Sequence, residues 1–172
     1  MTFDLNTIFV AAFTMLVVYA AVTDVKGLRI ANWTSIALVA LFAAYVVAGH
    51  LRLGTKPLPV LQHLSVALAV LAVGFAVFAF GYMGAGDIKL MTAVALWAGP
   101  GEVISFAFLT ALTGAGLALL ILSSAFCLNW DGSEATPARI SRLVPAWMSQ
   151  GVIPYGVAIS AGALMSVPSQ LL

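Results

Sequence analysis

Two aspartates stand out because each lies beside a long apolar segment. Asp24 follows the unbroken apolar run 8–22, which Thr23 closes. Asp87 and Lys89 are the only charged residues between positions 64 and 98. Two carboxyls in close contact cannot both ionise cheaply, so one of them keeps a proton near neutral pH. Such a pair can activate a water molecule and protonate a leaving amine, which is the chemistry of aspartic proteolysis and needs no metal ion or cofactor.

The composition predicts that these carboxyls belong to an integral membrane protein. Of the 172 residues, 63% are hydrophobic and 8% are charged, whereas soluble domains carry about 25% charged residues. A soluble chain of this size could not bury so much apolar surface, and a disordered chain would be more polar. The net charge of +1 gives no basis for nucleic-acid binding. The single cysteine, Cys127, cannot form an internal disulfide and is interpreted as an apolar packing residue.

The apolar segments predict an all-α, polytopic membrane protein with about six transmembrane helices and a single domain over residues 1–172. A helix needs about 20 residues to cross the bilayer core. The N-terminus carries Asp4 but no Lys or Arg before the first segment, so we expect that segment to remain in the mature protein. The six expected segments are approximately 5–23, 33–48, 59–80, 84 or 87–98, 103–128 and 152–168.

The distribution of basic residues predicts the orientation in the cell (inner) membrane. With six spans, the odd-numbered loops hold five basic residues, whereas the even-numbered loops and the termini hold only Arg52 and Lys56. The positive-inside rule therefore places both termini outside and the odd-numbered loops in the cytoplasm. Asp24 and Asp87 then lie at the same, cytoplasmic face. The five residues are Lys26, Arg29, Lys89, Arg139 and Arg142.

The longest of these loops, residues 129–151, has two interpretations. Apolar residues at helical spacing lie beside Arg139 and Arg142, as in an interfacial amphipathic helix. Pro145 would break or kink such a helix, so a partly ordered connector remains the alternative.

The segment that begins near Asp87 is unusually short. Residues 87–98 would span about 18 Å as a helix, which is less than the roughly 30 Å of the bilayer core. Asp87 is therefore expected below the membrane surface, where an ionisable residue indicates function. Gly84 and Gly86 would leave room for an extended substrate backbone, or would form an ordinary turn. Lys89 either orients a carboxylate or extends toward the membrane surface, and we favour the second interpretation.

Three motifs resemble those of the type IV prepilin peptidases. The sequence Gly84-Ala85-Gly86-Asp87 with Lys89 resembles the GxGD signature of that family. Asp24-Val25-Lys26, with Arg29, Ile30 and Asn32, resembles its first-aspartate loop, and residues 153–156 (Ile-Pro-Tyr-Gly) resemble a motif near its last helix. The resemblance implies an intramembrane aspartic protease with Asp24 and Asp87 as its catalytic pair. It would cleave leader peptides from pilin-like precursors at the cytoplasmic face and act alongside a pilus assembly machinery.

The departures from the family pattern bear on the subfamily. Ala31 and Val157 stand where the family usually has proline. Larger members carry a cysteine-rich cytoplasmic region associated with N-methylation, and this chain has one cysteine. It resembles the short, peptidase-only branch associated with tight-adherence (Flp-type) pili.

Two other functions remain open from the residues alone. Intramembrane acids also mark proton paths, so the chain could be part of a proton-coupled transporter. It could also be a non-catalytic subunit of a pilus or secretion machine, in which case replacing both acids would leave precursor processing intact. His50 and His63 lie away from the aspartates in the sequence and are expected to be structural.

Overall fold

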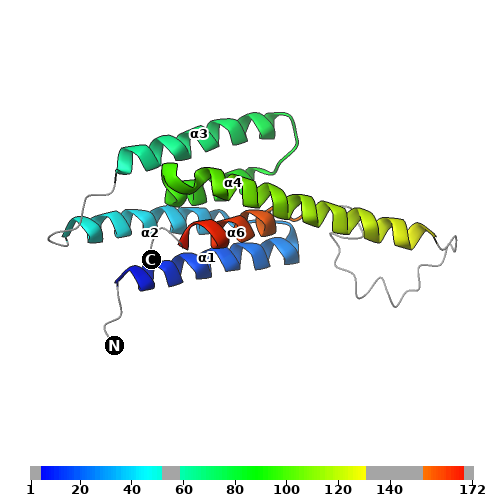
Figure 1. Ribbon diagram of the computed structural model, residues 1–172, viewed down its shortest axis with the longest axis horizontal. Coiled ribbons are helices and arrows are strands. Elements are labelled where there is room, and N and C mark those ends of the chain that lie inside the picture. Colours follow the sequence, from blue (N-terminus) through cyan, green and yellow to red (C-terminus); the bar gives the residue numbers. More distant parts are fainter. Residues whose placement is uncertain (1–4, 52–58, 131–152, 169–172) are drawn as a thin grey trace.

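The computed structural model describes residues 5–51, 59–130 and 153–168, with only the backbone described for 124–130. All secondary structure in these ranges is helical, as the sequence predicts. The helices are α1 (Leu5–Gly27), α2 (Asn32–Leu51), α3 (Val60–Ala79), α4 (Ala85–Trp130) and α6 (Tyr155–Ser166), and they form an elongated bundle (Figure 1). The expected interfacial helix falls mainly on residues 131–152, outside the described ranges.

Four helices in the described part of the chain, α1 to α4, are long and apolar enough to cross a membrane. The expected number of six spans is not confirmed. Two of the expected segments are joined in α4, and α6 has 12 residues, which is about 18 Å of helix and less than the bilayer core requires.

A break at Gly99 divides α4 into a first part (85–98) and a second part (100–130). Gly99 has φ 57° and ψ −168°, outside the helical region, and Pro100 follows it. Proline lacks the N–H that would continue the helix. The break coincides with the predicted end of the fourth segment. The first part runs antiparallel to α3, because Ile88 lies beside Gly74 near one end of α3 and Leu96 lies beside His63 near the other.

The second part of α4 returns along α6. Gly114 lies against Ala158, two residues beyond Gly156, which in turn contacts Asp24. Asp24, Asp87 and Gly156 thus define one end of the bundle, which we call the aspartate end. In Figure 1 the second part of α4 continues well past α6.

The opposite end, which we call the tryptophan end, is organised around Trp97 in the first part of α4. The Trp97 side chain is buried, and its indole N–H donates to the Leu38 carbonyl at 3.0 Å. The rings of Phe13, Phe42 and Tyr45 pack around it with centroid distances of 5.2–5.6 Å. Residues 93–98 are all buried, so this stretch is the central helix of the bundle, apolar on every side.

The outer surface carries large apolar side chains on every long helix. Met15 of α1, Ile36 of α2, Phe75 of α3 and Ile104 of α4 are among those that are mostly exposed. Soluble monomers do not expose such extensive apolar surface, and lipid contact explains it. The protein is therefore a membrane protein.

Candidate active site

Asp24 lies in the last turn of α1 and is 96% buried in the protein, since only 4% of it is exposed. Its Oδ2 accepts a hydrogen bond from the backbone N–H of Gly156 at 2.7 Å. Gly156 belongs to the first turn of α6, where N–H groups lack intrahelical partners and favour a negative group. The start of α6 therefore holds one oxygen of this carboxyl and fixes its orientation.

Gly156 allows this contact because it has no side chain. A Cβ at this position would lie 2.8 Å from Asp24 Oδ2 and equally close to Ile30 Cδ1. Any other residue would force the carboxyl, the isoleucine or the helix to shift.

Asp87 is the third residue of α4. Its Oδ2 accepts a hydrogen bond from the Gly84 N–H at 3.3 Å. An acidic side chain at the third helical position that reaches back to the residue before the helix is half of a capping box. Gly84 leaves space for that carboxyl, because a Cβ there would lie 2.9 Å from Oδ2. The residues at the start of α4 thus fix the position of the Asp87 carboxyl.

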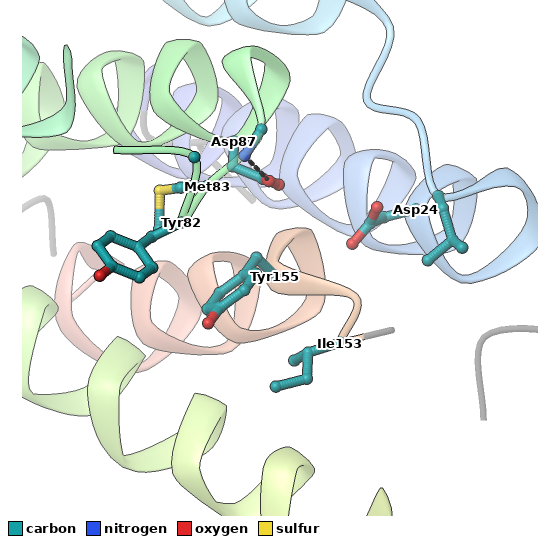
Figure 2. A pocket seen from close by; sticks show the side chains of 9 residues that line it. Asp24, Tyr82, Met83, Asp87, Ile153 and Tyr155 are labelled. Carbon is teal, nitrogen blue, oxygen red and sulfur yellow. Dashed lines mark hydrogen bonds between the residues drawn. The ribbon is translucent and has the colours of Figure 1, made fainter. Parts of the chain in front are cut away.

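The two aspartates line one cavity of about 580 Å³ at the aspartate end. Figure 2 shows their carboxyl groups on the two sides of this cavity, with Tyr155 of α6 and Tyr82 of the α3–α4 connection also on its wall. Both aspartates also line an adjoining hollow of about 440 Å³. Residues 63 positions apart in the sequence therefore share one site, and there is room for a substrate segment and for water between them.

Leu28 lines both spaces from the end of α1. Its φ of 49° lies in the left-handed region, which is costly for a residue with a Cβ. Backbone strain of this kind clusters at functional sites. The left-handed conformation of Leu28 turns the chain out of α1 one helical turn after Asp24.

Gly86 and Lys89 also line the adjoining hollow. A Cβ on Gly86 would lie 3.4 Å from Ile30 Cβ and 3.5 Å from the Ile30 carbonyl, so this glycine brings the α1–α2 connection close to α4. The Lys89 ammonium donates to Asn32 Oδ1 at 3.0 Å. This contact joins the starts of α2 and α4.

The two histidines lie away from the aspartates. His63 is buried near the start of α3, and its Nδ1 is 2.9 Å from the Leu96 carbonyl oxygen. His50 Nδ1 is 2.9 Å from the Val46 carbonyl oxygen within α2. Both contacts are local or between helices, as expected for structural residues.

Sequence reasoning did not assign Gly156 and Tyr155 to the site. The only signal was the motif at 153–156, which carries no chemistry by residue type. A backbone N–H is present at almost every position, so its contact with Asp24 has no signature in the sequence.

Comparison with known proteins supplies the identity that the geometry leaves open. Residues 11–119 match the type IV leader peptidase family. This range contains both aspartates of the site, Asp24 in α1 and Asp87 in α4. No curated protein and no solved structure matches the chain. The match extends over more than half of the sequence, and the chain belongs to the type IV leader peptidase family.

Proposed function

We propose that Asp24 and Asp87 are the catalytic pair of an intramembrane aspartic endopeptidase, which cleaves the leader peptide from type IV pilin-like precursors. Family membership provides the general activity, a leader peptidase that acts on prepilins. The observation that carries the finer proposal is the shared cavity, because both carboxyls face one space at one end of the bundle.

The proposed reaction uses one water molecule and both carboxyls. The ionised carboxylate accepts a proton from the water while the water oxygen attacks the scissile carbonyl carbon. The protonated partner donates its proton to the carbonyl oxygen, which gives a tetrahedral diol. The carboxyls then exchange roles. One protonates the amide nitrogen, the other takes a hydroxyl proton, the C–N bond breaks, and the original protonation of the pair returns.

The hydrogen bonds within the site support this division of labour. Gly156 and Gly84 each occupy Oδ2 of one aspartate. Each contact orients its carboxyl, and the backbone of Val157 adds a second hydrogen bond to Asp24. A carboxylate can accept about four hydrogen bonds, so capacity remains for water and substrate. Preorganised groups of this kind lower the barrier because they need not reorganise during the reaction.

The proposal assigns no N-methyltransferase activity to this chain. A single cysteine cannot supply the cysteine-rich region associated with that activity in larger relatives. A precursor processed only by this protein should therefore have a free, unmethylated N-terminus.

The decisive experiment replaces each aspartate by asparagine and measures cleavage of a co-expressed precursor by mass. Asparagine retains the shape and can still accept the bonds from Gly156 or Gly84, but it cannot exchange the proton. Asp24→Asn and Asp87→Asn should each lower kcat/KM by at least about a thousandfold, and the double variant should be little worse. The wild-type rate should fall at both low and high pH, because one carboxyl must be ionised and the other protonated.

Asp4→Asn and Asp131→Asn serve as matched controls and should process precursor at the wild-type rate. Both positions lie outside the described residues. If either dyad variant cleaves as fast as the wild type, the assignment is wrong. A proton flux that depends on the same acids, with no cleavage, would favour the transporter instead.

We further propose that the aspartate end faces the cytoplasm, with both termini outside. The basic residues of the odd-numbered loops support this orientation. A membrane-impermeant thiol reagent added outside should label Gly54→Cys and miss Ser133→Cys, in a chain whose Cys127 is replaced by alanine. Both probe positions lie outside the described residues. The reverse labelling would put the aspartates at the outer face.

A further inference from the structure

A second, largely apolar groove of about 520 Å³ runs between α2 and α3 along the first part of α4. Ala40 and Ala43 of α2 and Leu71 of α3 contribute to its walls. Near the tryptophan end α2 and α3 meet, where the rings of Phe42 and His63 lie 5.6 Å apart. Toward the aspartate end the groove separates the two helices.

Two hydroxyl residues on facing helices line this groove. Ser35 of α2 is 93% buried, since 7% of it is exposed, and Thr92 belongs to α4. Within the described part of the chain, neither Ser35 Oγ nor Thr92 Oγ1 has a hydrogen-bond partner. Buried hydroxyls are nearly always paired, and both of these unpartnered hydroxyls belong to residues that line the groove. The pair indicates an occupant that supplies polar hydrogens.

The groove is continuous with the candidate active site. Asn32 and Lys89, which bond to each other at 3.0 Å, line both this groove and the hollow that contains Asp24 and Asp87. A chain that leaves the aspartates past Asn32 and Lys89 therefore reaches the groove directly.

We propose that this groove is the docking site for the apolar helix of the precursor, on the carboxyl side of the scissile bond. The proposal rests on the proposed function and names the surface that positions the substrate for it. Asp87 acts on the extended segment, and the substrate helix begins beside Ser35 and Thr92.

The dimensions fit this arrangement. Thr92 is five residues beyond Asp87, a rise of about 7.5 Å along α4. Two extended substrate residues cover about 6.6 Å, so the helix would start at the level of the two hydroxyls. The first N–H groups of any helix lack partners within it. Ser35 Oγ and Thr92 Oγ1 would accept hydrogen bonds from these groups, and the apolar walls would contact the helix side chains.

Another groove, between the two parts of α4 and the start of α6, also adjoins the candidate active site, because Met83, Ile153 and Tyr155 line both spaces. Among the described residues, however, it has no facing pair of unpartnered hydroxyls. It is lined by Ala111, Ala115 and Thr110. The unpartnered hydroxyl of Thr110 packs against Gly162 of α6, so it is directed into the bundle. This groove provides matched control positions.

Cysteine cross-linking tests the docking directly. The protein carries Asp24→Asn, Asp87→Asn and Cys127→Ala, and the precursor carries one cysteine in the first two turns of its apolar helix. Ala40→Cys should form a disulfide with the precursor under mild oxidation, whereas Ala115→Cys should not. The disulfide yield reports the position of the precursor helix and not its cleavage. Docking can therefore be tested whether or not Asp24 and Asp87 are the catalytic pair. Cross-linking from Ala115→Cys alone, or from neither position, would overturn the proposal.

Kinetics of the active enzyme provide the second test. Ser35→Ala with Thr92→Val should raise KM for full-length precursor by about tenfold, since each lost hydrogen bond weakens binding roughly fivefold or less. The kcat should stay within about twofold, because the carboxyls are untouched. A peptide that lacks the apolar helix should be cleaved equally by both enzymes. Ala40→Trp should also raise KM by filling the groove, with Leu112→Trp on the exposed face of α4 as its control.

An unchanged KM in both the double variant and Ala40→Trp would refute docking here. That result would assign the groove to another occupant, such as a phospholipid chain.

Discussion

The two ends of the bundle each use a glycine to seat a buried polar side chain, yet they differ in what surrounds it. At the tryptophan end, Gly99 lies against the His63 ring, and the neighbouring Trp97 is enclosed by aromatic side chains. At the aspartate end, Gly156 lies against the Asp24 carboxyl, which borders a cavity of about 580 Å³. The same device stabilises a structure in one place and presents a reactive group in the other.

The buried polar groups at the two ends differ in how much of their hydrogen-bonding capacity the protein itself satisfies. The indole ring of Trp97 has one hydrogen-bond donor, its N–H group, and the Leu38 carbonyl accepts that hydrogen bond. The carboxyl of Asp24 can accept about four hydrogen bonds, and the backbone N–H groups of Gly156 and Val157 supply two of them. A buried polar group with spare capacity is costly in an apolar bundle unless water or substrate completes it. The buried carboxyl at the aspartate end therefore lowers the stability of the fold, which is typical of a functional site.

Among the glycine variants, the largest loss of activity should come from Gly156→Ala. The new Cβ would lie 2.8 Å from Asp24 Oδ2, and because Asp24 is buried its carboxyl has little room to move. A displacement of about 1 Å in a reacting group can reduce the rate about a hundredfold. We expect a loss in kcat/KM of that size, with little change in the thermal unfolding temperature in detergent. Gly114→Ala, whose Cβ would make an ordinary 3.7 Å contact with Ala158, should be fully active.

The converse result is expected for Gly99→Ala at the tryptophan end. Its φ of 57° disfavours any side chain, and the added Cβ would collide with the His63 ring. We expect a loss of about 2–4 kcal/mol in the free energy of unfolding. The folded fraction should retain its kcat/KM, because the site is at the other end. Unfolding by heat, followed together with cleavage by the surviving folded protein, measures both. A stable but inactive variant would remove the distinction between the two ends.

Within the aspartate end, Gly84→Ala should have a smaller effect than Gly156→Ala. Its Cβ would lie 2.9 Å from Asp87 Oδ2, but Asp87 is only partly buried and its carboxyl can rotate aside. We expect a decrease of about tenfold in kcat/KM. This is smaller than the roughly hundredfold loss expected when a reacting carboxyl is held about 1 Å out of place. Gly86→Ala, with its nearest contact at 3.4 Å to Ile30, is the neighbouring control and should stay within about threefold of wild type. Equal losses at both glycines would mean that α4 packing, not carboxyl position, limits activity.

The sequence predicted the parts of this molecule that depend on local composition. Apolar length identified the helices, and the predicted end of the fourth segment at residue 98 coincides with the break at Gly99. The positions of Asp24 and Asp87 beside apolar segments selected them before any geometry was known. The number of spans was less secure, because hydrophobicity alone does not distinguish a short buried helix such as α6 from a spanning one.

The partners of the polar side chains were not predictable. His63 pairs with the Leu96 carbonyl and Lys89 with Asn32, across 33 and 57 positions respectively. These contacts depend on how the helices pack, and carbonyl or amide groups that accept them are common to most residues. Lys89 illustrates the point, since its charge suggested the membrane surface or a carboxylate and its partner is an amide.

The bond between Gly156 and Asp24 has a consequence for synthesis, because its two residues are separated by 132 positions. A ribosome adds about 5–20 residues each second, so about 7 to 26 seconds separate the synthesis of Asp24 from that of the amide that orients its carboxyl. Both aspartates exist for most of that interval in an incomplete chain. The hydrogen bond that orients Asp24 can form only when α6 joins α1, so the packing of α6, the last helix of the described residues, is the step that completes the site.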